Sequence, residues 1–219
     1  MEHQGGSVSA GPTLAEEIVH AVTHGVGALL SLGALVMLVA FAATHGSTQN
    51  VVGAAVFGAS LVLVYVSSTV YHAMPARHRA LKERLQILDH VAIHLLIAGT
   101  ATPITLSAIG GRTGWTLLAI VWALALFGIV VETTPLRRFT KLSIGCYLGS
   151  GWVGMLALPT LASALSAWAL SLLVLGGVAY TVGVPFFLAH QRRWMHAWWH
   201  GFVLAGSALH VACVALVLQ

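Results

Sequence analysis

The chain has 219 residues, of which 58% are apolar and only 7% are charged. Soluble domains usually carry about 25% charged residues, so the composition excludes an ordinary soluble protein and predicts a chain whose solvent is mostly lipid. Ten Lys and Arg residues outnumber six Asp and Glu residues, which gives a formal net charge of +4.

Seven apolar segments, each long enough to cross a bilayer as a helix, use nearly the whole chain. In chain order they lie near residues 18–42, 51–73, 86–109, 114–131, 141–158, 162–187 and 196–218. Runs such as 28–43 are apolar on every face, whereas membrane β-strands alternate apolar with polar residues. We therefore expect an all-α bundle of seven transmembrane helices, forming one domain over residues 18–219. Residues 1–17 contain no Lys or Arg and are expected to form a short cytoplasmic segment and not a signal peptide.

The basic residues predict the orientation of the bundle, because positively charged loops stay in the cytoplasm. Nine of the ten lie around the loops after the second, fourth and sixth spans, and only Arg112 lies on the other side. This pattern puts the amino terminus inside and the carboxyl terminus outside. It also explains the positive charge as a topology signal and an attraction to anionic lipids, so the charge gives no support for nucleic-acid binding.

Polar side chains that are unusual in a membrane gather at the predicted cytoplasmic helix ends. Ser68 and His72 end the second span, Asp89 begins the third, and His196 and His200 begin the seventh. Residues four apart share one helix face, so the seventh span can chelate a metal, and His72 would complete a three-histidine zinc site with one position left for water. Asp89 would orient or deprotonate that water, and Ser68 would donate a hydrogen bond to Asp89, the water or a substrate carbonyl.

Other readings of the polar residues stay open at this point. His90 and His94 are also four residues apart and could chelate a metal instead. The three proposed ligands could also be ordinary polar residues that extend to the membrane interface. Glu17 either caps the first helix or faces the basic loops.

Several motifs resemble the bacterial hemolysin III family, which is a branch of the progestin and adiponectin receptor group and is more distantly similar to the alkaline ceramidases. They are Glu17 through Thr23-His24-Gly25, Ser67-Ser68-Thr69-Val70-Tyr71-His72, Leu88-Asp89-His90-Val91-Ala92-Ile93, Ala98-Gly99-Thr100-Ala101-Thr102-Pro103 and His196-Ala197-Trp198-Trp199-His200. The resemblance implies seven helices around an intramembrane zinc near the cytoplasmic side. It implies His72, His196 and His200 as ligands, Asp89 as the carboxylate that acts through the bound water, and Ser68 as its neighbour. The chain departs from the common family pattern at two positions: His20 stands where Asn is common, and His94 where Tyr is common.

Two classes of function fit these features. The first is a zinc-dependent hydrolase that cleaves an amide or ester of a membrane lipid, with Asp89 as general base and Ser68 helping to stabilise the oxyanion. The second is a non-enzymatic sensor or regulator of membrane state in which zinc is structural. A cytolysin, which the family name suggests, is a third and weaker reading, because short loops offer no soluble form that could insert. In all three readings the partners are membrane lipids, and we expect a multi-pass protein of the bacterial inner membrane.

Overall fold

The computed structural model describes residues 11–219, and within this range the chain folds into helices without a strand. The longest elements are α1 (Leu14–His45), α2 (Thr48–Ala73), α3 (Arg79–Pro103), α4 (Gly111–Thr133), α5 (Thr140–Trp152), α7 (Ala167–Leu188) and α8 (Met195–Val217). A π-helical segment (Ile104–Ile109) extends α3, a 3-10 turn (Pro135–Arg138) precedes α5, and a second 3-10 segment (Val153–Ala157) joins α5 to the short α6 (Leu158–Ala164). Residues 1–10 of the predicted amino-terminal segment lie outside the described range.

Seven helical stretches are long and apolar enough to cross a membrane, which confirms the predicted multi-pass architecture. The first begins at Leu14, four residues before the predicted start, because Thr13 and Glu16 form a capping box. In that box the backbone N–H of Glu16 donates to the Thr13 side chain, and the Glu16 carboxylate accepts from the Thr13 backbone, which satisfies two N–H groups that a helix start leaves free.

The predicted boundary between the fifth and sixth spans, at residues 158–162, is wrong. The fifth span runs from Thr140 to Ala164, and the sixth begins at Ala167. Pro159 has no N–H to donate within a helix, and it lies in the first turn of α6, directly after the 3-10 segment. Ser166 then caps α7 by accepting a hydrogen bond from the backbone N–H of Ala169. The continuous apolar run over this region conceals the change of helix.

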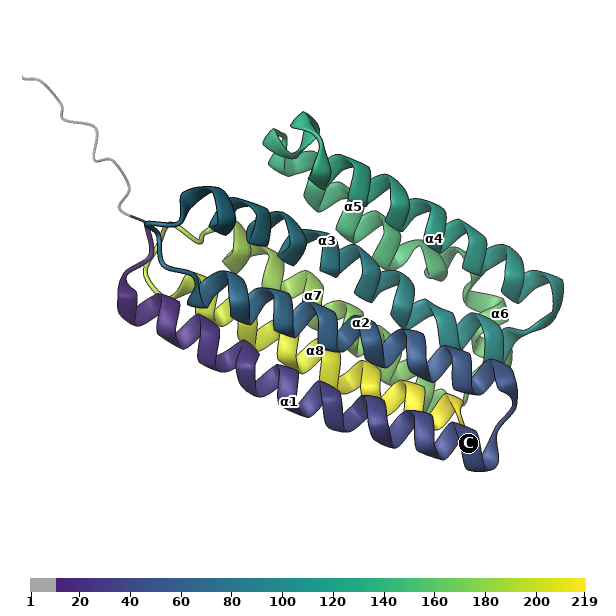
Figure 1. The fold of residues 1–219 in the computed structure, drawn as a ribbon. Helices are drawn as coiled ribbons and strands as arrows, with labels where there is room; N and C mark the ends of the chain where they lie inside the picture. The colour runs from purple at the N-terminus through teal and green to yellow at the C-terminus, as the bar shows by residue number, and fades with distance from the viewer. Residues whose placement is uncertain (1–10) are drawn as a thin grey trace, which may run out of the picture.

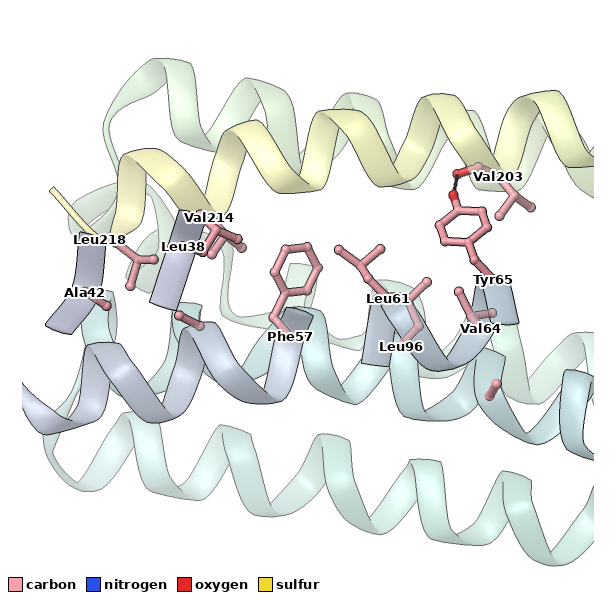
Figure 2. Packing of buried hydrophobic residues seen from close by; sticks show 12 residues of the cluster. Leu38, Ala42, Phe57, Leu61, Val64, Tyr65, Leu96, Val203, Val214 and Leu218 are labelled. Atoms are coloured by element: carbon pink, nitrogen blue, oxygen red, sulfur yellow. Dashed lines mark hydrogen bonds between the residues drawn. The ribbon is translucent and has the colours of Figure 1, made fainter. Parts of the chain in front are cut away.

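The main hydrophobic core lies between α1, α2, α3 and α8. Figure 2 shows Phe57, Leu61 and Tyr65 projecting from α2 toward α8, with Val203 and Val214 opposite them. The buried Tyr65 hydroxyl bonds to the Val203 carbonyl at 3.3 Å and the Ser207 hydroxyl at 2.8 Å. A buried phenol needs such partners, so these bonds hold α2 against α8 at this level of the bundle.

The helix order brings distant parts of the chain together at one end of the bundle. Helix α1 packs on α2 and α8, α2 packs on α3, and α3 packs on α4. In Figure 1 the start of α1 lies at the same end as the start of α3, and the carboxyl terminus lies at the opposite end. The end of α2 and the starts of α3 and α8 therefore lie at the same end of the bundle as the start of α1. The sequence analysis predicted that these helix ends lie on one side of the membrane.

Candidate metal centre

His72, His196 and His200 come together in the structure although they lie on two helices. Each offers one ligand atom, and these three atoms lie within 4.8 Å of one another. His72 and His200 are 6% and 1% exposed, so both side chains are buried inside the bundle. Three imidazoles at the meeting ends of packed helices form a group that could hold a metal ion.

The His72 ring is fixed by Glu17, a residue from α1. The His72 Nδ1 atom lies 2.7 Å from Glu17 Oε2, and Lys82 Nζ donates to Glu17 Oε1, also at 2.7 Å. An ionised carboxylate only accepts hydrogen bonds, so Nδ1 of the neutral ring carries the proton and Nε2 keeps its lone pair. That Nε2 atom is buried and has no hydrogen-bond partner within residues 11–219, which is the state a metal ligand requires.

Thr23, also on α1, fixes the ring of His200 in the same way. Its hydroxyl donates to the backbone carbonyls of Val19 and His20, at 2.8 and 3.0 Å. The Thr23 oxygen also lies 3.1 Å from His200 Nδ1. When the single proton of this hydroxyl is directed at one of the two carbonyls, the His200 Nδ1–H donates to the Thr23 oxygen, and Nε2 of His200 is then the acceptor nitrogen. Both orienting residues were missed as such from the sequence.

Two further histidines of α1 border the same group. The His20 ring lies 4.8 Å from the His72 ring and 4.8 Å from the His196 ring, measured between centroids. The His24 ring stacks on His200 with a centroid distance of 3.5 Å and an interplanar angle of 14°. Glu17, His20 and His72 form a second possible metal-binding group, which shares His72 with the first.

Asp89 and Ser68, the two other residues singled out from the sequence, lie next to the histidines. Ser68 is 1% exposed and lies one helical turn before His72 on α2. Asp89, His72 and His196 line one cavity of about 340 Å³. Asp89 belongs to neither group of possible ligands in the described chain, so it faces the same space as the histidines without joining them.

Of the rival pair, His90 enters a different polar network, whereas the His94 ring packs beside Tyr147 with no hydrogen bond to either of its nitrogens in the described chain. His90 Nδ1 lies 3.4 Å from Glu132 Oε2, and the Tyr147 hydroxyl donates to Glu132 Oε1 at 2.9 Å. Neither His90 nor His94 belongs to a group of three possible ligands in the range 11–219. The network forms another wall of the 340 Å³ cavity, which His90, Glu132 and Tyr147 also line.

An apolar cavity adjoins the polar one. It measures about 360 Å³, lies among α3, α4, α5, α7 and α8, and shares Tyr147 and Phe187 with the polar cavity as lining residues. Its other walls are mostly aliphatic side chains such as Ile97, Leu117 and Val184. A polar cavity at the histidines thus has an apolar cavity as its neighbour, with Tyr147 and Phe187 lining both.

Glu16 ties the start of α1 to the start of α8. Its Oε1 atom accepts a hydrogen bond from the backbone N–H of Trp194 at 2.8 Å. Trp194 precedes α8 and has a φ of 64°, a conformation that is strained for a bulky residue. The contact holds the backbone of Trp194, the residue directly before α8, beside the start of α1.

Comparison with known proteins places the chain in one family. The model of the family described as "Haemolysin-III related" matches residues 13–211. The chain is 47% identical over 202 residues to a Bacillus subtilis (strain 168) protein named "Hemolysin-3 homolog", an alignment that covers 92% of this chain and 94% of that protein. It is 46% identical over 199 residues to the Bacillus cereus protein "Hemolysin-3", covering 91% and 90%. The chain is thus a multi-pass membrane protein with a possible metal site of histidine and glutamate side chains, and it belongs to the haemolysin-III-related family.

Proposed function

We propose that the protein is a zinc-dependent hydrolase that cleaves an amide or ester bond of a membrane lipid in the bacterial inner membrane, close to the cytoplasmic leaflet. The observation that carries this proposal is the cavity that His72, His196 and Asp89 line together, with an apolar cavity on the other side of Tyr147 and Phe187. A purely structural metal needs neither a carboxylate facing the same cavity nor a space for a lipid chain.

His72, His196 and His200 fit zinc by the chemistry of their donors. The hydrogen bonds of Glu17 and Thr23 leave Nε2 of His72 and Nε2 of His200 as acceptors, and neutral imidazole nitrogens are common zinc ligands. Zinc bound there would polarise a carbonyl group and make water acidic enough to lose a proton near neutral pH.

Asp89 is the group in this cavity that we assign as general base. It would accept a proton from the attacking water as the new carbon–oxygen bond forms, and it would return that proton to the leaving nitrogen or oxygen as the old bond breaks. Ser68, which is buried one turn before His72, would help to stabilise the oxyanion. The products are then a fatty acid and a free amine or alcohol.

The substrate class follows from the shape of the space. An acyl chain fits the aliphatic walls of the 360 Å³ cavity, and the bond to be cleaved would lie where that cavity meets the polar one, near Tyr147 and Phe187. Cavities of this volume are typical of small-molecule sites. Ceramides and other acyl lipids with an amide or ester next to the chain are therefore the substrates to test first.

The experiment is a turnover assay with zinc-loaded protein in nanodiscs, with released fatty acid measured by mass spectrometry. Asp89→Asn should keep its zinc and lose hydrolysis by about 100-fold or more, which is the contribution expected of a general base. Glu132→Gln is the matched control, because Glu132 lines the same cavity but belongs to no group of possible ligands in the described chain. Full activity of Asp89→Asn would refute the mechanism.

A structural role for zinc is the second candidate, and one observation favours it. The possible ligands lie on α2 and α8, and Glu17 and Thr23 of α1 hold the rings, so a metal would clamp three helices. In that case the protein would sense or regulate membrane state without turnover. Zinc-dependent thermal stability with no hydrolysis of any acyl lipid would support this candidate.

A further inference from the structure

Lys82 differs from the other basic residues between α2 and α3 in where its side chain lies. Arg77, Arg79 and Arg84 are exposed, and a basic residue that only marks the topology of the chain needs no other position. The Lys82 side chain is only 18% exposed, whereas lysine side chains are mostly exposed in proteins unless they are paired. The contacts of Lys82 must therefore account for its inward position.

Three groups surround the Lys82 ammonium, and all belong to residues beside the candidate metal centre. The Nζ atom donates to Glu17 Oε1 at 2.7 Å and to the backbone carbonyl of Met74 at 2.9 Å. It also lies 5.2 Å from the centroid of the Tyr71 ring, within the roughly 6 Å at which a ring face attracts a cation. The ammonium thus contacts α1 and the end of α2 from its own place on α3.

The first contact reaches His72 through Glu17. One oxygen of the Glu17 carboxylate accepts from Lys82, and the other lies 2.7 Å from His72 Nδ1. Partners on both oxygens fix the rotation of a carboxylate, whose terminal torsion is otherwise broad. The Glu17 side chain is 15% exposed, so Lys82 is also the counter-ion of a charge that is largely withdrawn from water. Lys82 therefore acts on a possible metal ligand without touching it.

The second contact ties the start of α3 to the end of α2. Met74 follows α2 directly, two residues after His72, and Lys82 lies near the start of α3. Asp89 comes seven residues after Lys82, so it lies on the same face of α3 and about 10 Å further along the helix. Because α3 is a continuous helix from Arg79 to Pro103, its contact with Met74 sets the depth of Asp89 relative to His72.

We propose that Lys82 is a positioning residue for the hydrolysis, which holds His72 through Glu17 and holds Asp89 through the junction of α2 and α3. This inference rests on the proposed function and names one residue that controls both the metal and the general base. Among the described residues, Lys82 lines neither the polar nor the apolar cavity. Its loss should therefore change zinc affinity and kcat, and leave substrate binding as it is.

The test compares Lys82→Met with Lys141→Met in full chains in nanodiscs. Lys141 is an exposed lysine at the start of α5, so the control removes the same charge by the same substitution. Zinc affinity is measured by competition with a chromophoric chelator. Values of kcat and KM are measured with a ceramide at saturating zinc.

Lys82→Met should raise the zinc Kd about 10-fold, the lower end of the contribution of groups that hold a metal ligand, because it acts one bond further from the metal than Glu17. Its kcat at saturating zinc should fall at least about 10-fold, since a misplacement of about 1 Å can cost roughly 100-fold in rate. Its KM should stay within a few-fold of the native value, and Lys141→Met should match the native protein in all three quantities. Lys82→Arg, which keeps the charge and the N–H donors, should lie closer to the native protein than Lys82→Met does.

A double variant decides the matter even if Lys82→Met does not fold. Lys82→Met alone leaves the Glu17 carboxylate without its counter-ion, whereas Glu17→Gln together with Lys82→Met removes both charges. The double variant should bind zinc within a few-fold of Glu17→Gln alone, because both substitutions break the same link, and its kcat at saturating zinc should be about 10-fold lower, because the Met74 contact is also lost. A further 10-fold loss of zinc affinity would overturn the link through Glu17, and an equal kcat would overturn the link to Asp89.

Failure of the proposed hydrolase gives a different pattern. If the native protein cleaves no acyl lipid but the zinc Kd of Lys82→Met rises as predicted, the hydrolase is refuted and Lys82 still positions the metal ligand. If lipid is cleaved and Lys82→Met matches Lys141→Met in zinc Kd and kcat, the hydrolase stands and the role of Lys82 is refuted.

Discussion

Replacement of Glu17 by Gln tests whether the carboxylate on α1 tunes the metal site. Glu17 Oε2 lies 2.7 Å from His72 Nδ1, and the two side chains are only 15% and 4% exposed, so water screens the contact weakly. Partners that hold the second nitrogen of a metal-binding histidine contribute about 10- to 100-fold to affinity. The short, buried contact puts Glu17→Gln in the upper part of this range, about 30- to 100-fold, or roughly 2–3 kcal/mol when each tenfold is about 1.4 kcal/mol.

The assay is a competition titration of purified protein against a chromophoric zinc chelator at fixed pH and salt. Glu16→Gln is the matched control, because the same substitution one residue earlier affects the contact with Trp194 and leaves His72 alone. That variant should bind zinc within a few-fold of the native protein. Equal affinities of native protein and Glu17→Gln would refute the inference that Glu17 orients His72.

Two further predictions concern other residues. Thr23→Val removes the oxygen that lies 3.1 Å from His200 Nδ1, so zinc affinity should fall about 10-fold, whereas Thr23→Ser keeps the oxygen and should retain the native affinity. The same chelator titration measures both variants. An unchanged zinc affinity in Thr23→Val would exclude the orienting bond. Gly128→Ala places a methyl group against the ring of His94, and such overpacking costs about 1–3 kcal/mol of stability. Thermal unfolding in detergent should show a lower midpoint for this variant. Gly145→Ala, whose added methyl meets nothing within 4 Å, should unfold at the same temperature as the native protein.

The helices could be predicted from the sequence because lipid imposes strict requirements on the chain. A backbone in lipid must satisfy its own hydrogen bonds, so long apolar runs become helices, and all seven were found. The residues at which the helices begin and end were harder to predict. The start of α1 at Leu14 depends on the Thr13 capping box, and the turn before Ala167 lies inside a run with no charge to reveal it.

The histidine group was partly predictable for a similar reason. His196 and His200 share a helix face, and helix ends at the same depth bring His72 to them. The polar start of α1 was expected at the same end of the bundle, and Glu16, His20 and His24 lie four residues apart on its buried face. The contacts of Glu17 with His72 and of Thr23 with His200 were not predicted, because they depend on how α1 packs on α2 and α8. Figure 1 shows α1 beside α2 and α8, and only this packing brings His20 and Glu17 to the site.

The measurement that tests the central claim most directly is the metal content of freshly purified, tag-free protein, prepared without chelators and analysed by plasma mass spectrometry. The claim that His72, His196 and His200 hold zinc predicts about one zinc per native chain, lost in both His72→Ala and His200→Ala but kept in His94→Ala, since His94 belongs to neither group of possible ligands. A native protein without stoichiometric metal, or zinc that remains in both ligand variants, would contradict the claim.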